Sequence, residues 1–191
     1  MIPKKGPRNP SPHIRDRRSL FGLFVDYNGV DQWSADGISE RYRRYSASNG
    51  SEPARLDPRL YTEKKRVWSY PLMDAIISLI ERGDGAAIVV GIEFIEEDDF
   101  FSFGKILKSN TARALRRAVL TDEQQERVRQ RIVSMMLAGN VPHEFGEYRK
   151  LIKKVGVGHL WPKLDAEVDR DNRYVMRHYN YLKQHGAESQ P

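Results

Sequence analysis

The sequence predicts an all-α protein in which antiparallel helix pairs pack as an irregular bundle or as a short helical-hairpin array. Two observations carry this prediction: apolar residues recur at helical spacing, and turn signals divide these repeats into pairs. The pairs occupy Ser69 to Asp98 and Thr121 to Gly156. The balance of 39% hydrophobic and 30% charged residues is typical of a chain that builds its own core.

The length of 191 residues suits one domain with two appendages. Residues 1–18 hold four prolines and six Lys or Arg against one Asp, so we expect a flexible basic arm. Residues 19–185 are expected to form the helical domain, and residues 186–191 a polar tail. The arm accounts for most of the net charge of +6, which leaves the folded part nearly neutral.

The first folded segment, residues 19–33, allows two structures. One is a short helix that ends at Asn28-Gly29, and the other is a hairpin that turns at the same two residues. The run is too short for periodicity to decide, and a helix agrees slightly better with the rest of the chain. Either structure would dock three aromatic residues on the core: Phe21, Phe24 and Trp33.

Two further segments precede the first helix pair. Ile38 to Tyr45 is expected to be a short helix, and the turn formers of Ser46 to Pro58 indicate a loop. Another helix is predicted to begin near Asp57-Pro58 and to run through Val67, because proline is tolerated in the first turn of a helix.

The first helix pair is expected to begin at Ser69 and to turn at Gly83, with Asp84 as the cap of its second helix. That second helix is apolar nearly all round, which is typical of a buried helix. The β-branched residues in Ala86 to Val90 also allow a strand. We expect a helix because the apolar segment continues to Ile95. The first helix of the pair has a broad apolar stripe: Leu72, Met73, Ile76, Ile77, Leu79 and Ile80.

Residues 112–119 favour a helix, and the second pair then opens with Thr121 and Gln124 in the spacing of a capping box. Gly139 ends its first helix and Gly156 its second. The apolar stripes of these two helices are expected to face each other: Val128, Ile132, Met135 and Met136 on one, and Val141, Phe145, Tyr148, Ile152 and Val155 on the other.

The C-terminal part shows one more apolar face, with a break predicted at Asp169 to Asn172. Its members are Leu164, Val168, Val175, Tyr179 and Leu182. The two helix pairs are spaced somewhat more widely than HEAT units and do not align, so a HEAT-like array is expected in its packing only and not as a true sequence repeat.

Several classes of chemistry lack their sequence signature. The chain has no cysteine, no secretory signal, no apolar run of the roughly 18 residues that span a membrane, no G-x-S-x-G motif and no H-E-x-x-H motif. We therefore expect a cytoplasmic protein without metal or cofactor. A non-catalytic role is favoured, and an enzyme whose residues converge only in three dimensions stays open as a third hypothesis.

An acidic cluster ends the buried helix of the first pair, with Glu93, Glu96 and Glu97 followed by two aspartates. A carboxylate metal site in a helical bundle needs Glu-x-x-His pairs, whereas His143 precedes the glutamates near it. The cluster is therefore interpreted as a solvated patch that faces Lys105, Lys108 or Arg113 and offers a surface to a partner.

Basic and aromatic residues supply the remaining candidate surfaces. Arg113, Arg116 and Arg117 form a basic group on one predicted helix, although acidic residues interleave most other basic groups of the chain. Tyr174 and Tyr181 lie on the last predicted helix, and exposed tyrosines are common at interfaces. The first hypothesis for function is a protein-binding or adaptor module, with self-association as one form of it. The second is a nucleic-acid-associated protein that uses the basic arm and basic helix faces.

Overall fold

The computed structural model describes residues 18–19, 22–63, 66–99 and 103–185. This part of the chain is mostly helical and contains eight α-helices, two short 3-10 turns and four short strands. The predominance of helix confirms the predicted class, and the small sheet is an addition to it. Residues 1–17 of the predicted basic arm and residues 186–191 of the predicted tail lie outside the described residues.

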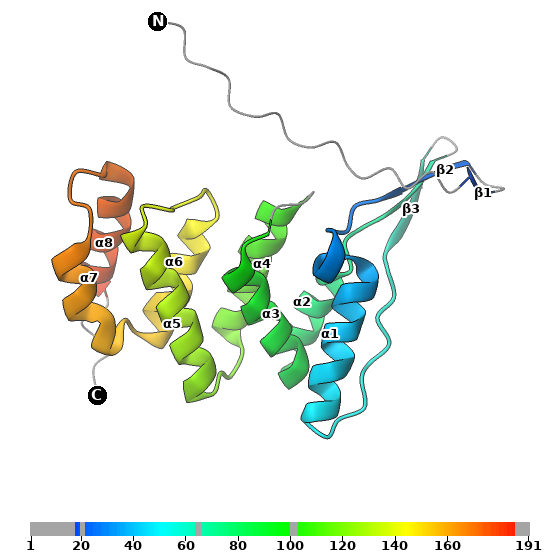
Figure 1. The fold of residues 1–191 in the computed structure, drawn as a ribbon, viewed down its shortest axis with the longest axis horizontal. Coiled ribbons are helices and arrows are strands. Elements are labelled where there is room, and N and C mark those ends of the chain that lie inside the picture. Colours follow the sequence, from blue (N-terminus) through cyan, green and yellow to red (C-terminus); the bar gives the residue numbers. More distant parts are fainter. Residues whose placement is uncertain (1–17, 20–21, 64–65, 100–102, 186–191) are drawn as a thin grey trace, which may run out of the picture.

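The helices lie in two layers (Figure 1). The first layer holds α1 (Ala35–Ser48), α3 (Gly85–Glu97), α5 (Asp122–Leu137) and α7 (Trp161–Glu167). The second holds α2 (Met73–Glu81), α4 (Gly104–Arg117), α6 (Phe145–Val155) and α8 (Arg173–His185). Within each layer a helix contacts the next member of the same layer, and α3 joins the layers by contacting both α2 and α4.

The four strands lie at the end of the array that carries α1 (Figure 1). They are β1 (Arg18–Ser19), β2 (Gly22–Asp26), β3 (Leu60–Glu63) and β4 (Arg66–Ser69), in the order β1-β2-β4-β3. The central pair β2 and β4 is parallel, so α1 and the 3-10 turn η1 (Asp31–Trp33) lie in the crossover between them. The pairs β1–β2 and β3–β4 are antiparallel.

The sheet corrects two predictions. Residues 19–33 form neither the favoured helix nor the hairpin, because β2 pairs with β4 from a distant part of the chain. The helix predicted from Asp57-Pro58 through Val67 is also wrong, because that segment supplies β3 and β4. Of the aromatic residues expected to dock on the core, Trp33 is buried and Phe24 half-buried, while Phe21 lies outside the described residues.

The helix predicted at Ile38 to Tyr45 is confirmed and is longer than expected. The hydroxyl of Ser34 accepts a hydrogen bond from the Gly37 amide at 3.1 Å and fixes its start. Ser69, predicted to cap the next helix, instead ends β4, and α2 begins at Met73. The strand considered for Ala86 to Val90 is wrong, since these residues belong to α3.

The other predicted helix ends are confirmed. The Asp84 side chain accepts from the Ala87 amide at 2.9 Å, and Thr121 and Gln124 form the capping box of α5. Gly83, Gly139 and Gly156 each adopt positive φ at the end of a helix. The predicted break at residues 169–172 separates α7 from α8.

One continuous core lies between the two layers and contains most of the predicted apolar stripes. Helices approach closely within this core at Gly91, where an added Cβ would lie 2.5 Å from Cδ1 of Ile80 and 3.3 Å from Cγ2 of Thr111. Glycine at this position lets α3 pack directly against α2 and α4.

Basic side chains also bind the carbonyl ends of neighbouring helices. Arg129 of α5 donates to the carbonyls of Val155 and Gly156 at the end of α6, at 3.0 and 2.9 Å. In the same way Arg131 reaches a carbonyl in the last turn of α3, and Lys154 of α6 reaches a carbonyl at the end of α4. Each cation neutralises part of the negative end of a helix dipole.

Candidate functional site

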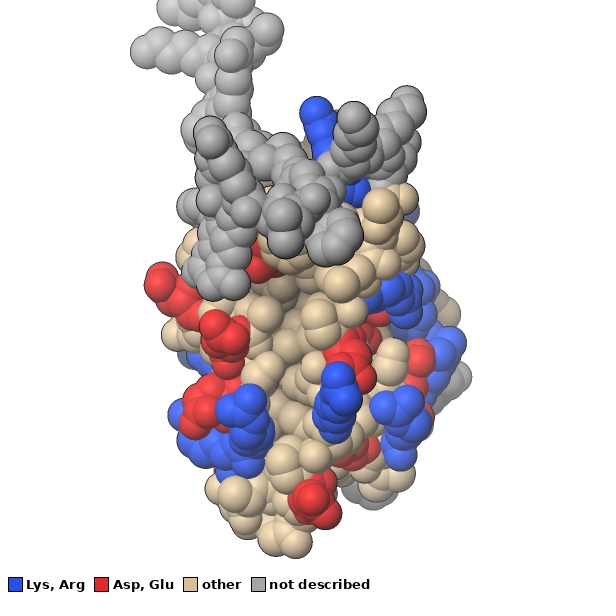
Figure 2. Space-filling view, turned by 90° about the vertical axis from the view of Figure 1, so that its right-hand side faces the viewer, with Lys and Arg blue, Asp and Glu red and all other residues tan. Residues whose placement is uncertain are grey.

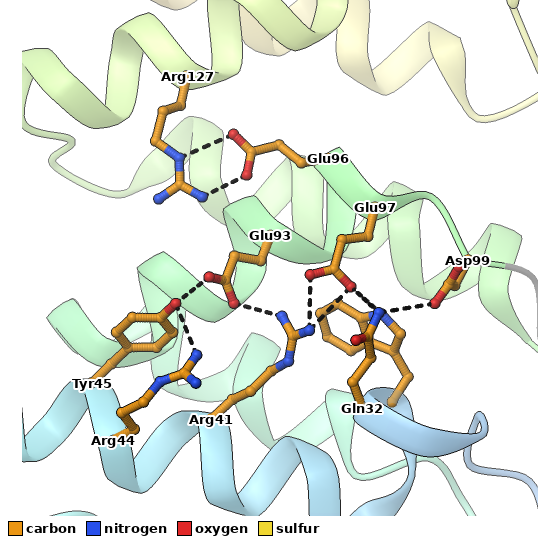
Figure 3. Close-up of polar contacts among 10 residues, drawn as sticks. Gln32, Arg41, Arg44, Tyr45, Glu93, Glu96, Glu97, Asp99 and Arg127 are labelled. Carbon is orange, nitrogen blue, oxygen red and sulfur yellow. Dashed lines mark hydrogen bonds and ion pairs between the residues drawn. The ribbon is translucent and has the colours of Figure 1, made fainter.

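The predicted acidic cluster lies where α1, α3 and α5 meet (Figure 3). Glu93, Glu96 and Glu97 project from the last turns of α3 toward basic side chains of the two flanking helices. The position of the cluster follows from the burial of α3, because both flanks of a central helix are covered by its neighbours.

Each of the three glutamates is neutralised within the fold. Arg41 of α1 binds Glu93 at 2.6 Å and Glu97 at 2.8 Å, with only 12% of its side chain exposed. Arg127 of α5 binds both carboxylate oxygens of Glu96, with its Nε 3.0 Å from Oε1. Bidentate contacts of this kind hold both partners in a fixed geometry.

Neighbouring polar groups complete this network. The Trp33 indole N–H donates to Glu97 at 2.8 Å, and its ring lies 4.5 Å below the Arg41 guanidinium. The Tyr45 hydroxyl donates to Glu93; burial, and then this hydrogen bond, raise the pKa of Tyr45. The carboxylates of the cluster therefore stabilise the contact of α1 and α5 with α3.

The two aspartates that follow α3 differ in their partners. Asp98, which ends the helix in a left-handed conformation, binds the buried Lys108 and also Arg131 at 3.3 Å. Asp99 lies 3.4 Å from the amide of Gln32. Lys108 was one of the partners predicted for the cluster, whereas Lys105 and Arg113 make no ion pair with it in the described chain.

The two layers differ in charge: α2 of the second layer carries Asp74 and Glu81 and no Lys or Arg, but the other three helices of that layer are strongly basic. The helices α4, α6 and α8 hold twelve Lys or Arg and a single acidic residue, Glu147. The helices α1, α3, α5 and α7 hold seven Lys or Arg and ten Asp or Glu. The acidic residues that follow Thr121 in sequence lie on α5, so they do not interrupt the basic helices in space. We name the surface of α4, α6 and α8 the basic face.

The basic face is hollowed where its three helices meet. A shallow depression of about 520 Å³ is lined by Arg116 of α4, by Lys150, Lys153 and Lys154 of α6, and by Tyr181 of α8. In the described part of the chain, Arg116 and Lys153 have no ion pair and no hydrogen bond to another side chain. Positive charge is therefore left over at this point of the surface.

Glu147 neutralises only the edge of the depression. Its carboxylate binds Lys150 at 2.8 Å and lies 3.7 Å from Arg113. Burial opposes ionisation of Glu147, but the hydrogen bond and charge of Lys150 and the charges of Arg113 and Arg116 outweigh it and lower its pKa. On the other side of α4, Arg117 binds Glu81 of α2 at 3.2 Å.

The two candidate tyrosines have different surroundings. Tyr181 lines the depression, and its ring lies 3.9 Å from the guanidinium of Arg149, a contact that connects α8 to α6. Tyr174 is 59% exposed; its hydroxyl and ring contact the neighbouring Arg173, and it does not line the depression.

A neutral histidine lies beside this contact. The ring of His178 packs 4.8 Å from that of Phe145, and its Nδ1 is buried without a hydrogen bond. Burial, and then the charges of Arg149 and Arg177, lower the pKa of His178 to about 4. The imidazole adds no charge to the basic face at neutral pH.

The end of the array that carries α1 has a different surface. Figure 2 shows Lys and Arg next to Asp and Glu around a strip of uncharged residues. Arg43 pairs with Glu40, and Arg55 pairs with Asp57. Charge of one sign does not gather there.

Some residues of the candidate surfaces can be predicted from the sequence, and others are identified only from the structure. Arg113, Arg116, Arg117 and Tyr181 were expected on basic or aromatic helices, and the structure brings Arg116 and Tyr181 into one depression. The Arg149–Tyr181 stack and the capture of the acidic cluster by Arg41 join residues far apart in the chain. Nothing in their local sequence signals either contact.

The described residues contain no group of three or more His, Asp or Glu arranged to hold a metal ion. None of their helices has the length and apolar character needed to cross a bilayer. No protein-family model, curated protein or solved structure matches the chain.

Proposed function

We propose that the chain is a non-catalytic binding module, built as a short HEAT-like array of helix pairs, and that the basic face is its recognition surface. The observation that carries the proposal is the charge difference between the layers. Most cations of α1 and α5 are used in ion pairs within the same layer, whereas Arg116 and Lys153 make no ion pair among the described residues.

The charge of this face determines the kind of partner it fits. Lysine and arginine that converge on a depression attract anions and raise the rate of their encounter. The protein or nucleic-acid partners expected from the sequence would therefore present carboxylates or phosphates to α4, α6 and α8. The acidic cluster of α3 is a weaker candidate for a recognition surface, because its glutamates already hold the fold together.

Retention on a heparin column tests the proposal. The double variant Arg116→Glu/Lys153→Glu reverses two charges of the depression. The matched control, Arg43→Glu/Arg55→Glu, reverses two exposed charges at the α1 end, and both variants have the same net charge. We expect the first variant to elute at a clearly lower salt concentration than the control. Equal elution of the two variants would show that net charge alone causes retention, and would refute the assignment of the basic face.

A further inference from the structure

We propose that the anionic partner of the basic face is a nucleic acid, held by its phosphate backbone and not by its base sequence. This inference rests on the proposed function and specifies its ligand. Three properties of the basic face favour a phosphate polymer: the spacing of its cations, the composition of its depression and the arrangement of Arg149.

The cations are distributed over three successive helices. Neighbouring packed helices lie about 8–10 Å apart. Cations of two adjacent helices, Arg116 of α4 and Lys153 of α6, line the depression, and Arg149 of α6 stacks on its Tyr181. An isolated phosphate can contact only one or two of them. A polymer with a phosphate at every nucleotide can contact several of them at once.

The residues that line the depression are more typical of a phosphate-binding site than of a protein–protein interface. Four of its five residues are Lys or Arg, and three of these are lysines. Lysine is depleted at protein–protein interfaces, which rely on an apolar centre, whereas surfaces that bind nucleic acid are strongly positive. Tyr181 is the one uncharged residue of the lining.

Arg149 presents a fixed donor group at this surface. Its guanidinium lies over the Tyr181 ring at 3.9 Å, and its Nε is buried without a hydrogen bond. A planar guanidinium held against an aromatic ring loses little freedom when it binds, and its edge matches two oxygens of a phosphate. The stack therefore places the terminal nitrogens of Arg149, as a preorganised phosphate donor, beside Tyr181 of the depression.

Binding of labelled oligonucleotides, measured by fluorescence anisotropy at several salt concentrations, tests this inference. The probes are a mixed-sequence 20-nucleotide single strand and the 20-base-pair duplex. If Arg116, Arg149 and Lys153 each contact a phosphate of the duplex, the affinity should fall roughly 40-fold between 50 and 200 mM salt. Probes of scrambled sequence should bind equally well.

A neutralised variant locates the contacts. Arg116→Gln/Lys153→Gln removes two phosphate contacts and should lower the salt slope of log affinity by about 2. The control Arg43→Gln/Arg55→Gln should keep the wild-type slope. Equal slopes for both variants would overturn the inference, because the phosphates would then be bound elsewhere.

Two other anionic probes separate this inference from the proposed function. Polyglutamate presents carboxylates, and vesicles of phosphatidylserine and phosphatidylcholine present an anionic membrane. One outcome would overturn the nucleic-acid inference while the proposed function stands. In that outcome the protein binds polyglutamate or the vesicles but not the oligonucleotides, and Arg116→Glu/Lys153→Glu loses this binding. Binding to no anion at low salt would overturn both.

Discussion

The layer of α1, α3 and α5 and the layer of α4, α6 and α8 use charged residues in opposite ways. In the first, Arg41 and Arg127 face glutamates of α3 and both partners are largely covered. In the second, Arg116 and Lys153 face the open depression without a carboxylate partner. The same residue types are thus joined in ion pairs on one side of the core, whereas Arg116 and Lys153 make none on the other.

This difference teaches how a nearly neutral folded domain can still carry a strongly charged surface. Most acidic residues of the helices lie in the first layer, so few carboxylates, among them Glu81 and Glu147, neutralise cations of α4, α6 and α8. A sum of charges along the chain hides this separation, because residues that are neighbours in sequence belong to different layers.

The largest expected change in stability comes from breaking the ion pairs between α1 and α3. Arg41→Met removes the partner of Glu93 and Glu97, which are partly buried, and we expect a loss of about 3 kcal/mol in the free energy of unfolding. Chemical denaturation measures it. The control Arg43→Met, at an exposed position, should cost under about 0.5 kcal/mol. Similar losses for the two variants would mean that the Arg41 network contributes no more than a surface ion pair.

A smaller effect should appear at low pH in the basic layer. The folded state lowers the pKa of His178 to about 4, below its ordinary value, so protons bind preferentially to the unfolded chain. The stability that depends on neutral His178 is complete above about pH 6.5 and decreases as the pH falls toward 4. Because the ring is partly solvated, we expect the loss to be about 1–2 kcal/mol.

His178→Phe should remove this part of the acid destabilisation, since a phenyl ring still packs on Phe145 and takes up no proton. Thermal unfolding between pH 4 and pH 7 measures the effect. His143→Phe, at an exposed position, serves as the control. A pH dependence unchanged by His178→Phe would show that burial and the charges of Arg149 and Arg177 do not lower the pKa of His178.

The smallest expected change in stability is an increase. Arg116→Gln/Lys153→Gln reduces repulsion within the basic face, and we expect the free energy of unfolding to rise by about 0.5 kcal/mol at low salt. The gain should vanish near 1 M salt, where charges are screened within about 3 Å. Chemical denaturation at two salt concentrations tests this, and a loss of stability at low salt would indicate that these cations have structural partners after all.

The sequence predicted the elements whose causes are local. The capping box of Thr121 and Gln124, the cap at Asp84 and the stop at Gly156 depend on neighbours within a few residues, and all are present. The strand β2 could not be predicted in this way, because its stability depends on pairing with β4 about forty residues later. The loss of the predicted helix before Val67 has the same origin.

The sequence predicted individual residues of the candidate site but not their arrangement. Arg116 and Tyr181 were expected to lie on basic and aromatic helices, but their meeting depends on how α4, α6 and α8 pack. The acidic cluster was recognised as a group, whereas its pairing with Arg41 and Arg127 requires knowledge of which helices flank α3. Composition identifies charged residues, and tertiary packing decides which of them are neutralised.

The basic side chains that bind neighbouring helix ends have a consequence for how the array comes apart. Arg129 holds the last carbonyls of α6, and Lys154 of α6 holds one at the end of α4. A helix end in the middle of the array therefore cannot fray without releasing a side chain of its neighbour. We expect backbone amides of α4 and α6 to exchange with deuterium in one concerted opening, and not helix by helix.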